Sequence, residues 1–179
     1  FKGKFSYASH NRITLPPPLE RHETDKILPL LQMLPLSDKN EALILAGAII
    51  CGHMAGALEW RPHFWLNSAA GGGKSDILNL VVTALQPTKF YYKGDTSPAG
   101  VRDDLKNAAG VVVIDELEKQ GGSAERMSSM NASRRVDGHI EMARSSSDGS
   151  VAKVAKGGPG GTGYSVQIRC CMFFASIYY

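Results

Sequence analysis

Cysteine is scarce in this chain: only three of its 179 residues are cysteines, and two of these, Cys170 and Cys171, are adjacent. Neighbouring residues of a strand point to opposite faces, so this pair does not suit a disulfide framework, and we expect a reducing compartment. An excess of charge is also lacking, because the formal net charge is only +3. A charge this small does not by itself indicate nucleic-acid binding.

Long apolar runs are almost absent, and the one exception covers residues 42–58, where His53 is the only polar interruption. A transmembrane helix usually needs about 20 apolar residues, which is more than this run offers. Asp38 and Glu41, just before the run, are typical of the capping box that starts a helix in water. We therefore expect a buried core helix and no membrane partner, with a membrane helix packed through glycines as the alternative. A signal peptide is not expected, because the first residues contain no apolar segment.

The length suits one domain with a small helical appendage. We expect residues 1–58 to form a lead-in and an N-terminal helical segment, and residues 59–179 to form a C-terminally truncated core. In that core, apolar strand-like runs alternate with helical patterns, which predicts a parallel α/β sheet flanked by helices. The expected strands are 63–67, 89–93, 110–116 and 170–177, and the expected helices are 24–34, 74–85, 97–108 and 124–143. A glycine-rich segment at 151–168 predicts a β-hairpin before the last strand.

The clearest chemical motif is the segment NSAAGGGKS at 67–75. A phosphate-binding loop reads G-x-x-x-x-G-K-[ST]; Gly73 to Ser75 supply its end, whereas Ser68 stands where the first glycine belongs. Glycines let backbone N–H groups turn inward around a phosphate at a helix N-terminus, Lys74 would reach the phosphates, and Ser75 would bind Mg²⁺. The predicted phosphate-binding residues are Ser68, Ala69, Ala70, Gly71, Gly72, Gly73, Lys74, Ser75 and Asp76. The alternative is a glycine-rich turn before a surface lysine.

A second motif, VVVIDE, closes the apolar strand at 110–116 with two acidic residues. A nucleotide hydrolase needs a carboxylate at the end of a strand to hold Mg²⁺ and a base to polarise the attacking water. Asp115 suits the first role and Glu116 the second. Alone, the pair could equally be a solvated acidic turn. Together with the glycine-rich loop, in this order and on these elements, it predicts a site for ATP or another nucleoside triphosphate.

These segments resemble the ATPase core of phage- and plasmid-type primase-helicases, which are AAA+ P-loop ATPases close to the superfamily III helicases. The resemblance is carried by WRPHFWLNSAAGGGKSDIL, GDTSPAGVRDDL, VVVIDELE and ARSSSDGS…KGGPGGTGYSVQIRCCMFFASI, and it covers about residues 40–177. It implies an ATP-driven ring, usually hexameric, that translocates on DNA in the cytoplasm of a bacterial or phage-infected cell. Position by position, Lys74 and Ser75 match the Walker A end, and Asp115 and Glu116 match Walker B.

The resemblance also implies a basic hairpin that grips DNA before the sensor strand. Lys153 and Lys156 would then meet DNA phosphates without reading sequence, and the alternative is a solvated hairpin with ordinary surface lysines. The sensor strand usually ends in an asparagine, and here the polar residue available at 170–177 is Ser176. Arg144 and Arg169 are candidate inter-subunit arginines, or else structural ion-pair partners.

The sequence therefore predicts a Mg²⁺-dependent ATPase that acts as a DNA helicase or translocase motor. One alternative is an ATPase of the same fold that remodels or packages DNA without unwinding it. Another is a nucleotide-binding scaffold without turnover, which would have no need of Glu116. We also expect Trp60, Phe64 and Trp65, which flank the first strand, to belong to the core rather than to stack on bases.

Overall fold

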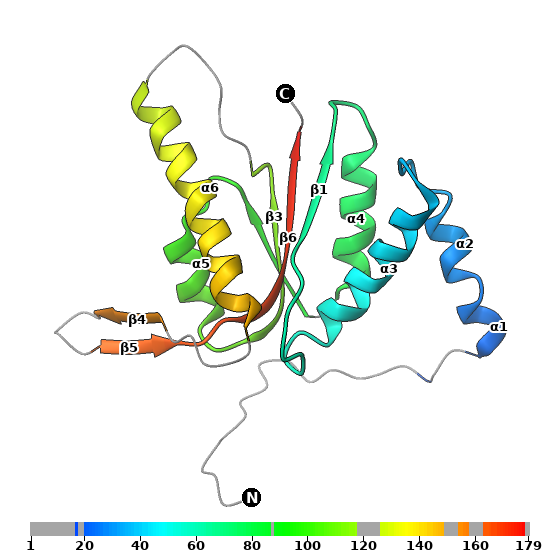
Figure 1. The fold of residues 1–179 in the computed structure, drawn as a ribbon, viewed down its shortest axis with the longest axis horizontal. Coiled ribbons are helices and arrows are strands. Elements are labelled where there is room, and N and C mark those ends of the chain that lie inside the picture. Colours follow the sequence, from blue (N-terminus) through cyan, green and yellow to red (C-terminus); the bar gives the residue numbers. More distant parts are fainter. Residues whose placement is uncertain are drawn as a thin grey trace, which may run out of the picture.

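The centre of the molecule is an all-parallel sheet of four strands in the order β1-β6-β3-β2 (Figure 1). The computed structural model describes residue 17 and residues 20–86, 88–117, 126–148, 154–157 and 163–177. The strands of the sheet are β1 (Phe64–Ser68), β2 (Lys89–Lys93), β3 (Ala109–Asp115) and β6 (Arg169–Ile177). All four agree with the strands predicted from the sequence to within one residue at each end, and the parallel α/β arrangement is confirmed.

Helices cover both faces of the sheet, as the alternating pattern predicts (Figure 1). One face carries α3 (Lys39–His53) and α4 (Lys74–Ala84), and the other carries α5 (Pro98–Leu105) and α6 (Arg126–Ser147). Two short helices, α1 (Arg21–Thr24) and α2 (Ile27–Leu31), precede α3 where a single helix at 24–34 was expected. Pro29 is compatible with α2 because it lies in the first turn, where a backbone N–H has no helical partner.

The two central strands are buried on both faces, and alternate residues enter two separate cores. Val112 of β3 and Cys170 of β6 pack with α5 and α6, whereas Val113 and Cys171 pack with α3 and α4. The adjacent cysteines therefore point to opposite faces, as the strand geometry predicts, and the three cysteines are free thiols. Burial on both faces is the reason that these strands read as continuous apolar runs.

Helix α3 is the apolar segment whose environment was in question, and one of its sides packs against the sheet. Ala42 and Ala48 are fully buried, and a Cβ on Gly52 would stand 2.6 Å from a methyl carbon of Val111 on β3. The Asp38 side chain caps the helix by accepting a hydrogen bond from the Asn40 N–H. Among the described residues, no helix is both long enough and apolar enough to span a bilayer.

Two expectations about individual segments need correction. The Trp60 side chain is 67% exposed and that of Trp65 is 46% exposed, so neither tryptophan is a core residue; Phe64 does pack, against Phe173. For Trp65 the reason is that β1 pairs with β6 on one side only, which leaves β1 as an edge strand, whereas Trp60 lies before β1. A glycine within a helix usually weakens it, but Gly138 lies within an unbroken α6 where Pro98 of α5 comes close.

The predicted hairpin is present as an antiparallel pair, β4 (Val154–Gly157) and β5 (Gly163–Val166). It leads directly into β6 and lies at the edge of the sheet where the parallel strands begin (Figure 1). The expected DNA-binding residue Lys153 and the turn at 158–162 lie outside the described residues, and Lys156 is placed on β4 by its backbone.

Candidate functional site

Polar side chains gather at the carboxyl ends of the parallel strands. Ser68 closes β1, Lys93 closes β2, Asp115 closes β3, and Ser176 lies next to the last residue of β6. In open α/β sheets, ligands bind in the crevice outside the carboxyl ends of the strands. The topology therefore brings segments that are far apart in the sequence to the position where a ligand is expected.

The glycine-rich loop joins β1 to α4 and adopts the conformations for which glycine is suited. Gly71 and Gly73 both have a φ of 78°, in the left-handed region that side chains with a Cβ rarely enter. The loop is also tied internally, because the Gly72 N–H donates to the Ala69 carbonyl at 3.1 Å. Ser68 lies outside the positive-φ residues, and its hydroxyl donates locally to the Ala69 carbonyl oxygen at 3.2 Å. A serine thus fits the position of the first motif glycine without backbone strain.

The loop is packed closely at its end and open at its tip. A Cβ on Gly73 would stand 2.6 Å from Pro35 Cγ, because the turn after α2 rests on the loop there. No atom lies within 4 Å of the corresponding position on Gly71. Ala69, Ala70, Gly71 and Gly72 are exposed, and so are Ser75 and Asp76 in the first turn of α4. The N–H groups of a first helical turn have no partner within the helix, so they can bind an anion placed there.

Lys74, the first residue of α4, reaches across β6 to the end of β3. Its Nζ lies 3.7 Å from Oδ1 of Asp115, and the two side chains are only 11% and 13% exposed. An ion pair this well shielded fixes both charged groups more firmly than a surface pair would. The two motifs that sequence analysis paired are therefore in direct contact.

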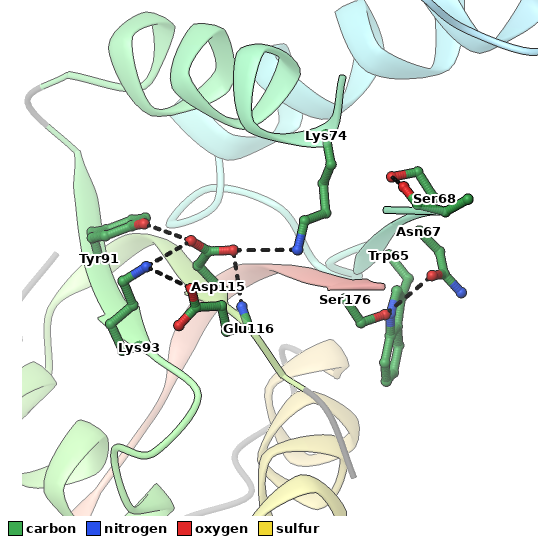
Figure 2. A network of polar contacts seen from close by, with 10 residues as sticks. Trp65, Asn67, Ser68, Lys74, Tyr91, Lys93, Asp115, Glu116 and Ser176 are labelled. Atoms are coloured by element: carbon green, nitrogen blue, oxygen red, sulfur yellow. Dashed lines mark hydrogen bonds and ion pairs between the residues drawn. The ribbon is translucent and has the colours of Figure 1, made fainter. Parts of the chain in front are cut away.

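Asp115 is held by donors from β2 as well (Figure 2). Its Oδ2 accepts hydrogen bonds from the Tyr91 hydroxyl and from Lys93 Nζ, each at 3.0 Å, and its Oδ1 accepts one from the Glu116 N–H at 2.9 Å. Burial by itself would raise the pKa of this carboxyl, but the bonds from Lys93 and Tyr91 and the charges of Lys93 and Lys74 outweigh it and lower the pKa. Asp115 is accordingly a carboxylate at neutral pH.

Glu116 has an uncommon backbone conformation for a side chain of its size, with a φ of 60°. Its side chain is 62% exposed, and Oε1 lies 3.4 Å from Lys93 Nζ, so the carboxylate faces Lys93 (Figure 2). Gly94 is the neighbour that makes this turn possible, because a Cβ there would collide with the Glu116 carbonyl group. Backbone outliers of this kind concentrate at functional sites.

Ser176 lies on β6, between β1 and β3, and it is buried, with a relative exposure of 6%. Its hydroxyl accepts a hydrogen bond from the Trp65 indole at 2.7 Å and donates one to Asn67 Oδ1 at 3.3 Å. Asn67 and Ser176 are partners in the β1–β6 register. Asn67, an exposed amide at the end of β1, is thus held by the residue predicted as the sensor.

A cavity of about 650 Å³ adjoins the glycine-rich loop. Ser68, Gly72 and Lys74 form its polar end, and it continues along the free edge of β1 toward Leu45 and Ala48 of α3. A pocket with a cationic, glycine-rich end and an apolar body suits a ligand with an anionic group and a flat or apolar part.

The residues predicted for Mg²⁺, Ser75 and Asp115, fit such an ion by their chemistry. Mg²⁺ takes oxygen ligands and usually keeps several waters, so one hydroxyl, one carboxylate and the phosphates of a nucleotide are a suitable set. Asp115 is ionised, and its Oδ1 lies toward the loop, where it accepts the Glu116 N–H and pairs with Lys74, whereas Lys93 and Tyr91 bind Oδ2. Ser75 is exposed in the first turn of α4.

The two candidate arginines lie away from this site. Arg169 begins β6, at the opposite end of the strand from Ser176, and Arg144 lies in the last turn of α6, where it pairs with Glu141 at 3.6 Å. Neither is placed near Lys74 of the same chain. The hairpin is likewise at the edge of the sheet where the strands begin (Figure 1).

Sequence reasoning did not identify Tyr91, Lys93 or Asn67 as site residues. A signal for the first two was present in KFYYK, since alternate residues of a strand share a face and Lys93 ends the strand. The parallel register that sets Lys93 beside Asp115 became visible only with the sheet. Comparison with known proteins adds no relative: no protein-family model matches the sequence, and no curated protein matches it.

Proposed function

We propose that the chain is a Mg²⁺-dependent P-loop nucleoside triphosphatase of the AAA+ type, with ATP as its substrate. The observation that carries this proposal is the contact between Lys74, at the end of a loop with two left-handed glycines, and Asp115, at the end of the acidic strand. Together these groups offer a triphosphate a ring of N–H donors, a shielded cation and a metal-binding carboxylate.

Each of these residues would have its own role in phosphoryl transfer. The N–H groups of residues 71 and 73–75 would cradle the phosphates at the N-terminus of α4, and Lys74 would neutralise charge that develops on the transferred group. Ser75 and Asp115 would hold Mg²⁺, which supplies charge neutralisation at the phosphate oxygens when bound. Catalysis of this kind depends on positioning and electrostatics rather than on a covalent intermediate.

Glu116 is the proposed base that orients and polarises the attacking water. Its carboxylate faces Lys93, so orienting a water at the terminal phosphate requires the side chain to leave that contact. Its 62% exposure leaves room for such a rotation. Ser176 and Asn67, linked by a hydrogen bond beside Lys74, are suited to orient the water or the terminal phosphate.

The test separates ATP binding from ATP hydrolysis. Lys74→Ala should weaken binding of a fluorescent ATP analogue, and Glu116→Gln should bind it as the parent chain does while hydrolysis falls by about 100-fold or more. Glu59→Gln, at an exposed glutamate outside the site, is the matched control. Hydrolysis that survives Glu116→Gln would refute the proposed base. Binding without any turnover in the parent chain would favour the nucleotide-binding scaffold.

We further propose that hydrolysis drives movement on DNA, as a helicase or translocase. The observation in favour is mechanical: only Gln167 and Ile168 separate the hairpin from β6, and the other end of β6 carries Ser176 beside the site. A shift of β6 on hydrolysis would therefore be transmitted to the hairpin. Lys153 and Lys156 are the proposed phosphate contacts on that hairpin.

Self-association into a ring, with six copies as the expected number, would complete the motor. Arg144 and Arg169 lie far from the site of their own chain, so they can serve a site only if copies pack head to tail. Such a contact closes into a ring when its rotation completes a circle.

The DNA proposal is tested by the rate of ATP hydrolysis with and without single-stranded DNA. Stimulation by DNA and unwinding of a forked substrate are expected, and both should be lost in the Lys153→Ala/Lys156→Ala double variant. Lys26→Ala/Lys39→Ala, in the turn before α2 and at the start of α3, controls for the loss of two positive charges. Hydrolysis and DNA binding without unwinding would instead favour a remodelling or packaging motor.

A further inference from the structure

Helix α3 has an apolar side that nothing in the described residues covers. Eleven large hydrophobic side chains are exposed among all the described residues. Seven of them belong to residues 27–54, the segment that contains α2 and α3. Four of these are Leu43, Ile44 and Ile50 on α3 and Met54 at its C-cap, which are 53%, 60%, 59% and 51% exposed. Concentration of exposed apolar groups on one surface, rather than single scattered residues, marks an interaction site.

Three of these residues and one glycine form a straight stripe along the helix. Leu43, Gly47, Ile50 and Met54 follow each other at spacings of four, three and four, so they lie on one face of α3. The opposite face, with Ala48 and Gly52, is the one buried against the sheet. No charged residue occurs between residues 42 and 58, where His53 is the one polar side chain, and the stripe itself consists of apolar residues.

The stripe is complementary to itself. Gly47 leaves a gap in it, because no atom lies within 4 Å of the position that its Cβ would take. If two copies of α3 pack antiparallel about a two-fold axis midway between residues 47 and 50, Gly47 of each copy faces Ile50 of the other. Leu43 then faces Met54 of the other copy. Each large side chain thus enters the gap left by a glycine or meets a flexible methionine, which is the packing that helix pairs require.

The antiparallel arrangement is also favoured by charge. It sets the N-terminus of one helix beside the C-terminus of the other, so the partial positive charge of one helix end attracts the partial negative charge of the other. We therefore propose that the α3 stripe is a homotypic docking surface that joins two copies of this chain about a two-fold axis. An isologous contact of this kind is distinct from the head-to-tail contact of a ring, and it does not depend on nucleotide hydrolysis.

The first test measures the mass of the chain in solution without nucleotide, by light scattering and sedimentation over a wide concentration range. The expected result is a concentration-dependent rise from 19.3 kDa to twice that value. Ile50→Glu should shift this equilibrium by at least about tenfold toward the single chain. Met130→Glu, which places the same charge on a 55% exposed methionine of α6, should leave it unchanged. A parent chain that stays at 19.3 kDa throughout would overturn the proposal.

A second variant distinguishes specific pairing from general stickiness. Gly47→Leu adds apolar surface in open space, so the single chain should fold as before. It also fills the gap that Ile50 of the second copy needs, so specific pairing predicts weaker association by about tenfold or more. Association that becomes stronger in Gly47→Leu would show a nonspecific apolar patch and would overturn the proposal.

Cysteine cross-linking tests the direction of the pair in a Cys51→Ser background. A mixture of Leu43→Cys chains and Met54→Cys chains should form cross-linked heterodimers on mild oxidation, because these positions face each other in the antiparallel pair. Leu43→Cys chains alone should not cross-link, since their cysteines lie at opposite ends of the contact. Efficient self-cross-linking of Leu43→Cys would show a parallel pair and contradict the proposed two-fold arrangement.

Discussion

At the scale of single residues, the most informative feature is the set of donors around Asp115. Sequence motifs place a carboxylate at the end of β3, but they do not say what holds it or which of its oxygens faces the loop. Tyr91 and Lys93 bind Oδ2, and Oδ1 remains on the side of Lys74. The edge strand β2 therefore determines how the acidic motif presents itself to the glycine-rich loop.

The role of Tyr91 predicts a change in the acidity of Asp115. Its hydroxyl donates to the ionised carboxylate, so Tyr91→Phe should raise the pKa of Asp115 toward its ordinary value. The measurement is a titration of the Asp115 carboxyl carbon by NMR. Tyr92→Phe is the matched control, because that hydroxyl donates to Asp104 instead, at 2.6 Å. An unchanged pKa in Tyr91→Phe, or an equal rise in both variants, would contradict this reading.

The lowered pKa of Asp115 also determines the direction in which stability changes with pH. The pKa of Asp115 is lowered in the folded chain, so its ionised form stabilises the fold above the ordinary pKa near 4. That contribution is lost as the pH falls through the lowered value. Tyr91→Phe should accordingly lose part of the stability difference between neutral pH and strongly acidic pH.

At the scale of elements, the loop between β1 and α4 depends on its glycines for two different reasons. Gly71 and Gly73 share a positive φ, which costs a residue with a Cβ about 1–2 kcal/mol. Gly73 additionally lies against Pro35, and Gly71 faces open space. Gly71→Ala should therefore lower the free energy of unfolding by about 1–2 kcal/mol, and Gly73→Ala by a further 1 kcal/mol or so because of overpacking. Urea unfolding without nucleotide measures both, and equal losses would rule out a role for the Pro35 contact.

Much of the element structure could be predicted from the sequence, because each local signal agrees with its tertiary setting. Ser97 and Pro98 begin α5 as expected, with the Ser97 hydroxyl accepting from the Gly100 N–H at 3.0 Å. The apolar runs of β3 and β6 became central strands because only burial on both faces accommodates them. The positions of the glycine-rich loop, Lys74 and Asp115 in the fold could also be predicted, because each motif specifies both the residue types and the element that carries them.

What could not be predicted depends on strand order and direction. The exposure of Trp65 follows from the edge position of β1, and the contact of Lys93 with Asp115 follows from the parallel β2–β3 register. Arg169 and Ser176 lie at opposite ends of β6, and the parallel pairing with β1 and β3 places Ser176 beside the carboxyl ends of those strands. Residue type and spacing carry no information on these points until the sheet is assembled.

At the scale of the whole molecule, the buried His139 and the half-buried His63 join the elements and predict a dependence of stability on pH. His139 of α6 bonds through Nε2 to the Thr96 carbonyl, and its Nδ1 is buried without a partner. His63, before β1, accepts the Met172 N–H at Nδ1 and contacts the Ser147 hydroxyl through Nε2. Burial, with nearby arginine charge, lowers the pKa of both side chains.

Protonation of either histidine opposes the fold, and the direction of the effect follows from linkage. In the unfolded chain both side chains bind a proton below about pH 6.5, whereas in the folded chain they do so only at lower pH. The unfolded state therefore binds more protons in this window, and the free energy of unfolding should fall as the pH falls below about 6.5. Asp115 does not contribute there, because its pKa is lowered and it titrates in a more acidic range.

The test compares urea unfolding at about pH 7 and about pH 5 in the parent chain and in His139→Gln, where the glutamine amide can still donate to the Thr96 carbonyl. The parent chain should lose stability on acidification, and the loss should be smaller in His139→Gln because one titrating group is gone. His22→Gln removes an exposed histidine from α1 and should retain the full loss. A parent chain equally stable at both pH values would show that neither histidine is kept neutral by the fold. An undiminished loss in His139→Gln would assign the effect to His63, whose Nδ1 must surrender its bond to the Met172 N–H when it takes up a proton.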